Sequence, residues 1–150
     1  MTDKPVAELP INNVTTFGNA SHHGEKMLNL DLLAEAPKPN AQRPRPAVKR
    51  VLSADGGNLI LFTFNASQSL PDHKAAHPIT VQTLRGEVFF TCEGKEVLLR
   101  PGQIIHLPAY VPHRVDAVES DGDSPAIMLL TMLTGETIAS TYDGDSIAKS

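Results

Sequence analysis

The sequence has one cysteine, no tryptophan, few aromatic residues and no long apolar run. The single cysteine, Cys92, cannot form an intrachain disulfide, so a disulfide framework is excluded and a reducing compartment is expected. No apolar run approaches the roughly 20 residues that span a bilayer, and the amino terminus lacks a hydrophobic signal core. These absences predict a soluble cytoplasmic protein.

A strong charge of either sign is also missing. The formal net charge of -4 and the pI of about 5.8 give no electrostatic basis for binding nucleic acid or an anionic membrane. The sequence contains no glycine-rich phosphate loop, serine-centred elbow or paired-cysteine zinc motif. Its 150 residues suit one domain. Function must therefore come from another chemistry.

The chain divides into three stretches by composition. Residues 1–46 are polar and dotted with proline, and end in a proline-rich connector over residues 36–46 that favours extended backbone. Residues 47–134 have a strand pattern, and residues 135–150 form a small polar tail. Within the first stretch, the leucines of residues 27–33 fit a strand by their alternation and a short helix by their spacing. Periodicity does not decide between the two.

The middle stretch reads as short strands separated by glycine and proline turns. Asp55-Gly56-Gly57-Asn58 favours a tight hairpin, because such residues accept positive φ. This pattern predicts an all-β, antiparallel sandwich or barrel. The expected strands are residues 48–52, 59–64, 79–84, 88–92, 97–99, 104–107, 113–118 and 126–133.

Two histidines sit in separate, strongly punctuated segments. His113 follows Gly102 and Pro108 with the spacing Gly-x5-Pro-x4-His, and His73 precedes Gly86 by the span of a second, longer motif. Histidine is the commonest metal ligand and titrates near neutral pH. We expect Gly86 and Gly102 to lie in turns, and the two rings to meet in one cavity.

The order and spacing of these segments resemble the two motifs of the cupin superfamily. The second motif is matched without a gap. The first motif is usually His-x-His-x3-Glu-x6-Gly, and anchoring it on Gly86 places His73 in its first position. Ala75 and Ile79 then stand where the second histidine and the glutamate belong. The resemblance implies a cupin β-barrel, or jelly roll, with an incomplete metal set and an irregular amino-terminal extension.

The resemblance also implies a function at the barrel mouth. A divalent transition metal (iron, manganese, nickel or zinc) is expected at partial occupancy on His73, His113 and His77, in an enzyme of the dioxygenase, isomerase or decarboxylase type. The alternative is a non-catalytic, metal-free module that binds or senses a small molecule. Small cupins commonly dimerise, so a homodimer is expected, with residues 14–33 adding a strand to a neighbouring copy.

The remaining candidates each have a structural alternative. His77 lies roughly 13 Å from His73 on an ideal strand, so it ligates only if the chain bends near Pro78; otherwise it is a surface-loop residue. Gln82 is a candidate ligand-binding residue in an alternative register, or else a buried amide. His106 is a candidate ligand-binding residue, or else a histidine packed under a loop.

Overall fold

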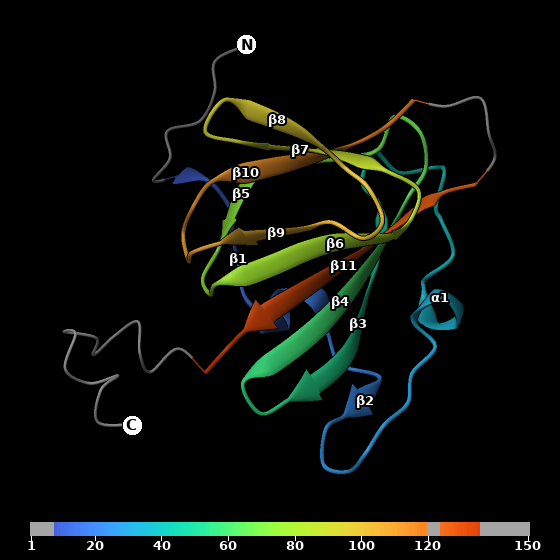
Figure 1. The fold of residues 1–150 in the computed structure, drawn as a ribbon, viewed down its shortest axis with the longest axis vertical. Helices are drawn as coiled ribbons and strands as arrows, with labels where there is room; N and C mark the ends of the chain where they lie inside the picture. The colour runs from blue at the N-terminus through green and yellow to red at the C-terminus, as the bar shows by residue number, and fades with distance from the viewer. Residues whose placement is uncertain (1–7, 120–123, 136–150) are drawn as a thin grey trace, which may run out of the picture.

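The computed structural model describes residues 8–119 and 124–135, and about half of these residues lie in strands (Figure 1). Nearly all of the expected tail, residues 136–150, is outside the described part. Among the described residues, no helix is long and apolar enough to cross a membrane. The elements, in chain order, are β1 (Ile11–Asn12), the 3₁₀ helix η2 (Val14–Phe17), β2 (His22–His23), α1 (Leu32–Glu35), β3 (Ala47–Ala54), β4 (Gly57–Phe64), β5 (Ser69–Ala75), β6 (Ile79–Arg85), β7 (Val88–Cys92), β8 (Lys95–Leu99), β9 (Ile104–Leu107), β10 (His113–Ala117) and β11 (Ala126–Leu133).

The strands form two sheets that face each other across a shared core. One sheet has the order β1-β5-β10-β7-β8 and the other the order β2-β3-β4-β11-β6-β9. Figure 1 shows these sheets as two layers that meet at a corner. The ladders between barrel strands are antiparallel, as expected. The short arm strands differ, because β1 pairs with β5 and β2 with β3 in parallel. The expected jelly-roll barrel is confirmed, with mixed rather than wholly antiparallel sheets.

The turns follow the glycine signals of the sequence. Glu93 and Gly94 both have positive φ (52° and 77°) in the two-residue loop between β7 and β8, as a type I′ turn requires. Gly86 (φ 71°) and Gly102 (φ 92°) lie in turns, as predicted. At Gly86 a β-carbon would also stand 3.0 Å from the α-carbon of Ala126, so two constraints select glycine there.

Strand β5 was missing from the expected set. It holds Pro71, Asp72 and Lys74, and the neighbours Pro71 and Asp72 are both exposed, so it shows no clean apolar alternation. Its place between β1 and β10 comes from pairing with segments far away in the sequence. The strand ends at Ala75, and the chain then bends through residues 76–78, as Pro78 indicated.

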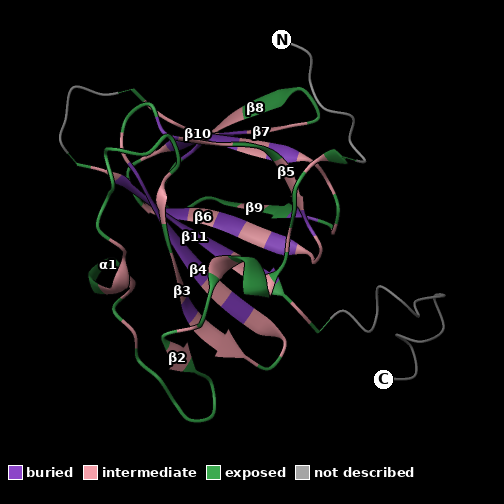
Figure 2. Ribbon diagram, turned by 180° about the vertical axis from the view of Figure 1, so that it is seen from behind, coloured by how far each residue is buried: buried purple, intermediate pink, exposed green. Residues whose placement is uncertain are grey.

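Strands β4 and β11 are buried on both faces, which explains their continuous apolar runs (Figure 2). Their inward residues, including Phe62 and Met128, belong to the main core between the sheets. On the outer face, Leu61 and Leu129 form a second cluster with residues of the extension. The extension residues that cover it are Leu30, Leu32 and Ala36.

The amino-terminal extension folds back on its own barrel. Phe17 contacts Phe62 edge-on, with ring centroids 5.7 Å apart, and packs against the main core. The strand alternative for residues 27–33 is wrong: the segment is irregular and ends in one helical turn, α1, capped by Asp31. Leu28 is 41% exposed, because the alternation does not match any paired strand. The connector is held by the Gln68 amide nitrogen, which donates to the carbonyls of Asn40 and Arg43.

Candidate ligand site at a histidine pair

His73 and His113 meet inside the barrel. They are cross-strand partners of β5 and β10, and their ring centroids are 4.2 Å apart with the planes 61° apart. Direct cross-strand partners present their side chains on the same face of a sheet. The structure therefore confirms that the two rings lie side by side.

A backbone carbonyl fixes each ring. Nδ1 of His73 lies 2.7 Å from the carbonyl oxygen of Pro71, and Nδ1 of His113 lies 2.9 Å from that of Val111. A carbonyl only accepts hydrogen bonds, so each Nδ1 carries a proton and donates it. In the neutral ring Nε2 is then the atom with the free lone pair. Within the described residues, neither Nε2 atom has a hydrogen-bond partner.

Both Nε2 atoms remain within reach of a small solute. Among the described residues, the one fully buried side-chain nitrogen or oxygen without a partner is Arg50 Nε. The Nε2 atoms of His73 and His113 also lack partners, so they must touch solvent-accessible space. The His113 side chain as a whole is nevertheless buried, with 5% exposed. The histidine pair is thus largely buried, but its two Nε2 atoms are accessible to solvent or to a small molecule.

The surroundings keep the pair neutral. Burial, followed by the neighbouring His73 ring, lowers the pKa of His113 to about 4. Burial also lowers the pKa of His73 and outweighs the hydrogen bond to Pro71, which acts in the opposite direction. On its other side, His113 stacks on Phe90, a core residue.

Cys92 is the third member of this cross-strand row. It is the partner of His113 on β7, as His73 is on β5, and it packs against the main core. Burial and then Glu93 raise the pKa of its thiol, so the sulfur is held as a thiol. From sequence alone Cys92 was only a small buried residue. The register that places it beside His113 depends on long-range pairing, and no local signal gives it.

The described residues do not assemble a complete metal site. Ala75 and Ile79, which stand at the usual ligand positions, are buried in the apolar core. His77 lies in the bend between β5 and β6. Among residues 8–119 and 124–135, no three histidine, cysteine, aspartate or glutamate side chains are grouped so as to hold a metal ion. The structure thus brings His73 and His113 together without His77, and two imidazoles fall short of the three protein ligands of a usual catalytic centre.

Gln82 and His106 lie away from the pair. Gln82 alternates with the buried residues Val81 and Thr83 of β6, so it points to the other face of the sheet. His106 is exposed on the edge strand β9 and is not packed under a loop, in contrast to the structural alternative. Neither side chain shares the inward face with His113.

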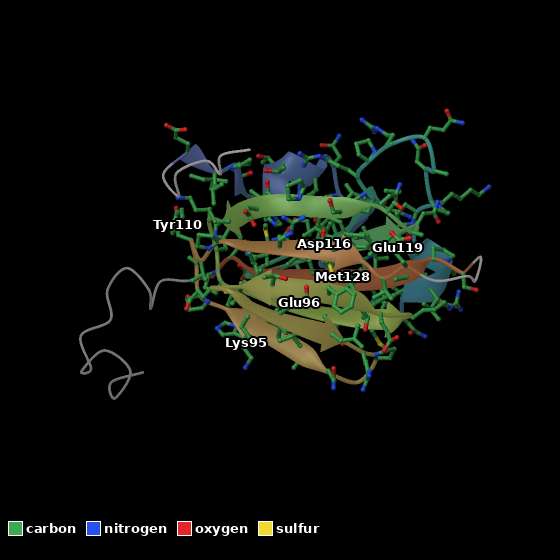
Figure 3. All side chains as sticks on the ribbon, turned by 90° about the horizontal axis from the view of Figure 1, so that it is seen from above. Lys95, Glu96, Tyr110, Asp116, Glu119 and Met128 are labelled. Atoms are coloured by element: carbon green, nitrogen blue, oxygen red, sulfur yellow. The ribbon has the colours of Figure 1, made fainter. Side chains whose placement is uncertain are left out.

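The loop before His113 is tied to the end of β5. Tyr110 has positive φ (66°), rare for a residue with a side chain, and its backbone N–H donates to the carbonyl of Ala75 over 2.7 Å. Its side chain is 54% exposed. Figure 3 shows Tyr110 at one end of the barrel and Glu119 toward the other, with Asp116 between them. The histidine pair belongs to the Tyr110 end.

A cavity of about 420 Å³ opens at the opposite end. Strand β10 runs from His113 to Ala117, and Ala117 lines the cavity, which puts it roughly 13 Å from the pair along the strand. This cavity and the histidines with lowered pKa values thus do not coincide. Polar groups with shifted pKa values mark a functional site better than volume does, so the histidine pair is the candidate site. The described lining residues are Phe64, Asn65, Ala66, Gly86, Glu87, Ala117, Val118, Ser124, Pro125 and Ala126.

Comparison with known proteins agrees with this geometry. The Cupin domain family matches residues 60–132, which run from β4 to β11 and include both histidines. The chain belongs to the cupin superfamily. No curated protein matches it.

Solved structures of other cupins share the fold. A cupin superfamily protein of Desulfitobacterium hafniense has 18% identity and a TM-score of 0.57, over 72% of this chain and 92% of that one. An RmlC-like cupin of Desulfovibrio desulfuricans has 24% identity and a TM-score of 0.58, over 71% and 97%. A DMSP lyase of Ruegeria pomeroyi has 22% identity and a TM-score of 0.52, over 62% and 49%. At these identities the likeness concerns the fold alone.

Proposed function

We propose that this cupin binds a small molecule at the pair of His73 and His113. The supporting observation is that the Nε2 atoms of the two adjacent rings lack partners among the described residues while both Nδ1 atoms are fixed. Each Nε2 lone pair faces accessible space without a protein partner, so it can accept a hydrogen bond from water or from a bound molecule. A ligand that donates to both atoms would replace that water. Phe90 and the apolar core behind it suit the nonpolar part of such a ligand.

A metal-assisted enzyme is the second candidate. It is favoured by the two Nδ1 bonds to backbone carbonyls, because metal-binding histidines usually donate their other ring nitrogen in this way. The grouping of only two imidazoles argues for a weak site with partial occupancy. His77 is the candidate third ligand if the bend at residues 76–78 rearranges. A DMSP lyase shares the fold, so this barrel is compatible with an enzyme, but the likeness gives neither activity nor substrate for this chain.

The proposal can be tested with protein that carries ¹⁵N-labelled histidine. Addition of small alcohols, amines and carboxylates should move the ring signals of His73 and His113 and leave those of exposed His106 in place. His113→Phe should abolish the response, and His106→Gln should keep it. If every compound leaves the pair unchanged, the pair is a structural contact and the proposal fails.

Metal analysis separates the two candidates. If the pair is a metal centre, protein incubated with iron, nickel, manganese or zinc and then desalted should retain metal below one ion per chain, and His113→Ala should lose it. Retention of metal by the native protein, with loss in His113→Ala, would support the metal-assisted candidate. Metal at background in both proteins would leave the metal-free module.

We also propose a homodimer, and a cytoplasmic location stays a prediction from the sequence. The edge strand β9 carries Ile104 with 60% of its surface exposed, and an edge strand offers free backbone groups for pairing. Residues 14–33 are a weaker candidate for pairing with a neighbouring copy. Residues of the extension already cover the outer face of their own sheet.

A further inference from the structure

The direction of the hydrogen bonds at the pair is set by geometry. The carbonyl oxygens of Pro71 and Val111 accept from Nδ1 of His73 and His113, at 2.7 and 2.9 Å. Those two protons are therefore committed to the backbone. What each neutral ring offers to a ligand is the Nε2 lone pair, which accepts a hydrogen bond and cannot donate one.

We infer that the ligand held by this pair presents hydrogen-bond donors, as hydroxyl or ammonium groups, and not a carboxylate. The inference rests on the proposed function. A carboxylate is an acceptor only, so it would face two lone pairs without any proton between them. A hydroxyl or ammonium group supplies the missing protons, and a vicinal diol supplies one for each ring.

The pair cannot easily turn into a donor by taking up protons. The rings are 4.2 Å apart, so two imidazolium ions would repel each other at close range. Phe90 lies parallel to His113 at 5.2 Å and gives a second positive charge no polar partner on that side. Cys92, next in the row, is a weak donor at most.

The charged groups nearby do not reverse this preference. Arg45 and Asp72 both act on His73, with opposite signs, so their fields oppose each other there. Both residues are exposed, where solvent weakens their effect. The acceptor role of the two Nε2 atoms therefore decides which class of ligand binds.

Three probes of one size test the inference: butane-1,2-diol, n-butylamine and butyrate. Each is titrated into ¹⁵N-histidine-labelled full chain at neutral pH, with the ring signals of His73 and His113 as the readout. We expect the diol or the ammonium ion to bind, and butyrate to bind at least about tenfold more weakly, since it leaves both acceptors without donors. His106→Gln should behave as the native chain, and His113→Phe should respond to none of the probes.

The ring signals also report the tautomer directly. Protonated Nδ1 and bare Nε2 on both rings agree with the inference, whereas Nε2–H on both rings overturns it. Butyrate binding more tightly than both donor probes also overturns it, while leaving the proposed function intact. If no probe moves the pair in a protein with the expected tautomers, the proposed function fails, and the inference fails with it.

Discussion

The imidazole of His113 lies nearly parallel to the phenyl ring of Phe90, with centroids 5.2 Å and planes 11° apart. Phe90 is only 2% exposed and belongs to the main core. One face of the imidazole is thus covered by an aromatic ring and shielded from water, which hydrates a positive charge far better than the core does. Core packing thereby keeps His113 neutral at neutral pH. The lowered pKa should be measurable as a pH dependence of stability.

The first prediction is a pH dependence of stability that His113 controls. The unfolded chain takes up a proton at an ordinary histidine pKa of 6.5, but the folded protein does so only at about 4. The unfolded state therefore binds more protons in this window, and the free energy of unfolding falls as the pH drops from 6.5 to 4. The expected loss from His113 is about 3 kcal/mol, and His73 acts in the same direction.

Urea unfolding across that window checks the effect against matched variants. His113→Phe should remove most of this pH dependence, and His106→Gln should retain it, because His106 is exposed on β9. Carboxylates that titrate in the same range affect all three proteins alike. Parallel pH profiles for the native chain and His113→Phe would contradict the prediction.

The second prediction concerns two glycines with similar backbone angles. Gly86 and Gly94 have φ of 71° and 77°, but only Gly86 lacks room for a β-carbon, because Ala126 lies 3.0 Å away. Gly94→Ala should lower the free energy of unfolding by about 1 kcal/mol, from backbone strain alone. Gly86→Ala should lower it by about 2 kcal/mol or more, since the backbone of β11 must also move. Equal losses in chemical denaturation would show that the close approach does not matter.

The third prediction concerns the carboxylate that holds the extension. Glu35 Oε1 lies 2.9 Å from His22 Nε2 and 3.2 Å from Lys49 Nζ, and these two contacts lower the pKa of Glu35. The ionised Glu35 carboxylate stabilises the folded extension above the ordinary carboxyl pKa. This stabilisation is lost as the pH falls through the lowered pKa of Glu35. Glu35→Gln should therefore speed amide hydrogen exchange in residues 22–35 at neutral pH. Glu25→Gln, at an exposed glutamate in the same segment, should change nothing. Equal exchange in the two variants would argue against the anchor.

The fourth prediction concerns the only cysteine. Burial and Glu93 raise the pKa of Cys92, and only the thiolate reacts with alkylating agents. Iodoacetamide should modify the folded protein more slowly than the urea-unfolded chain at the same pH. Its rate in the folded protein should keep rising above the ordinary thiol pKa of 9.0. A folded rate as fast as the unfolded one would show that Cys92 is not shielded beside His113.

The fifth prediction concerns assembly. Light scattering of the intact chain should give about twice the chain mass, and Ile104→Lys should lower it toward one chain. Thr80→Lys, on the neighbouring strand β6, is a matched control for added charge. A monomer for the intact chain would remove the dimer. An effect of Thr80→Lys as large as that of Ile104→Lys would place the contact elsewhere on the sheet.

Local chemistry in the sequence was enough for the strands and turns. Glycines at 86, 94 and 102 mark turns because positive φ is a property of the residue itself, whatever surrounds it. The apolar runs gave eight of the barrel strands, since alternation and burial are written into each segment. The spacing from Gly102 to His113 indicated the superfamily, because it encodes a turn, the strand β9 and the bend that follows it.

Only the tertiary structure decided which side chains meet. Cross-strand register places His73 and Cys92 on either side of His113, and register depends on pairing between segments that no local pattern relates. Long-range pairing also makes residues 69–75 a strand in spite of their polar side chains. In the extension, Leu30 packs on the outer face of the sheet, whereas Leu28 is exposed. Long-range packing competes with local preference at these positions and wins, because burying apolar surface across the sheet outweighs the weak propensity of a short segment.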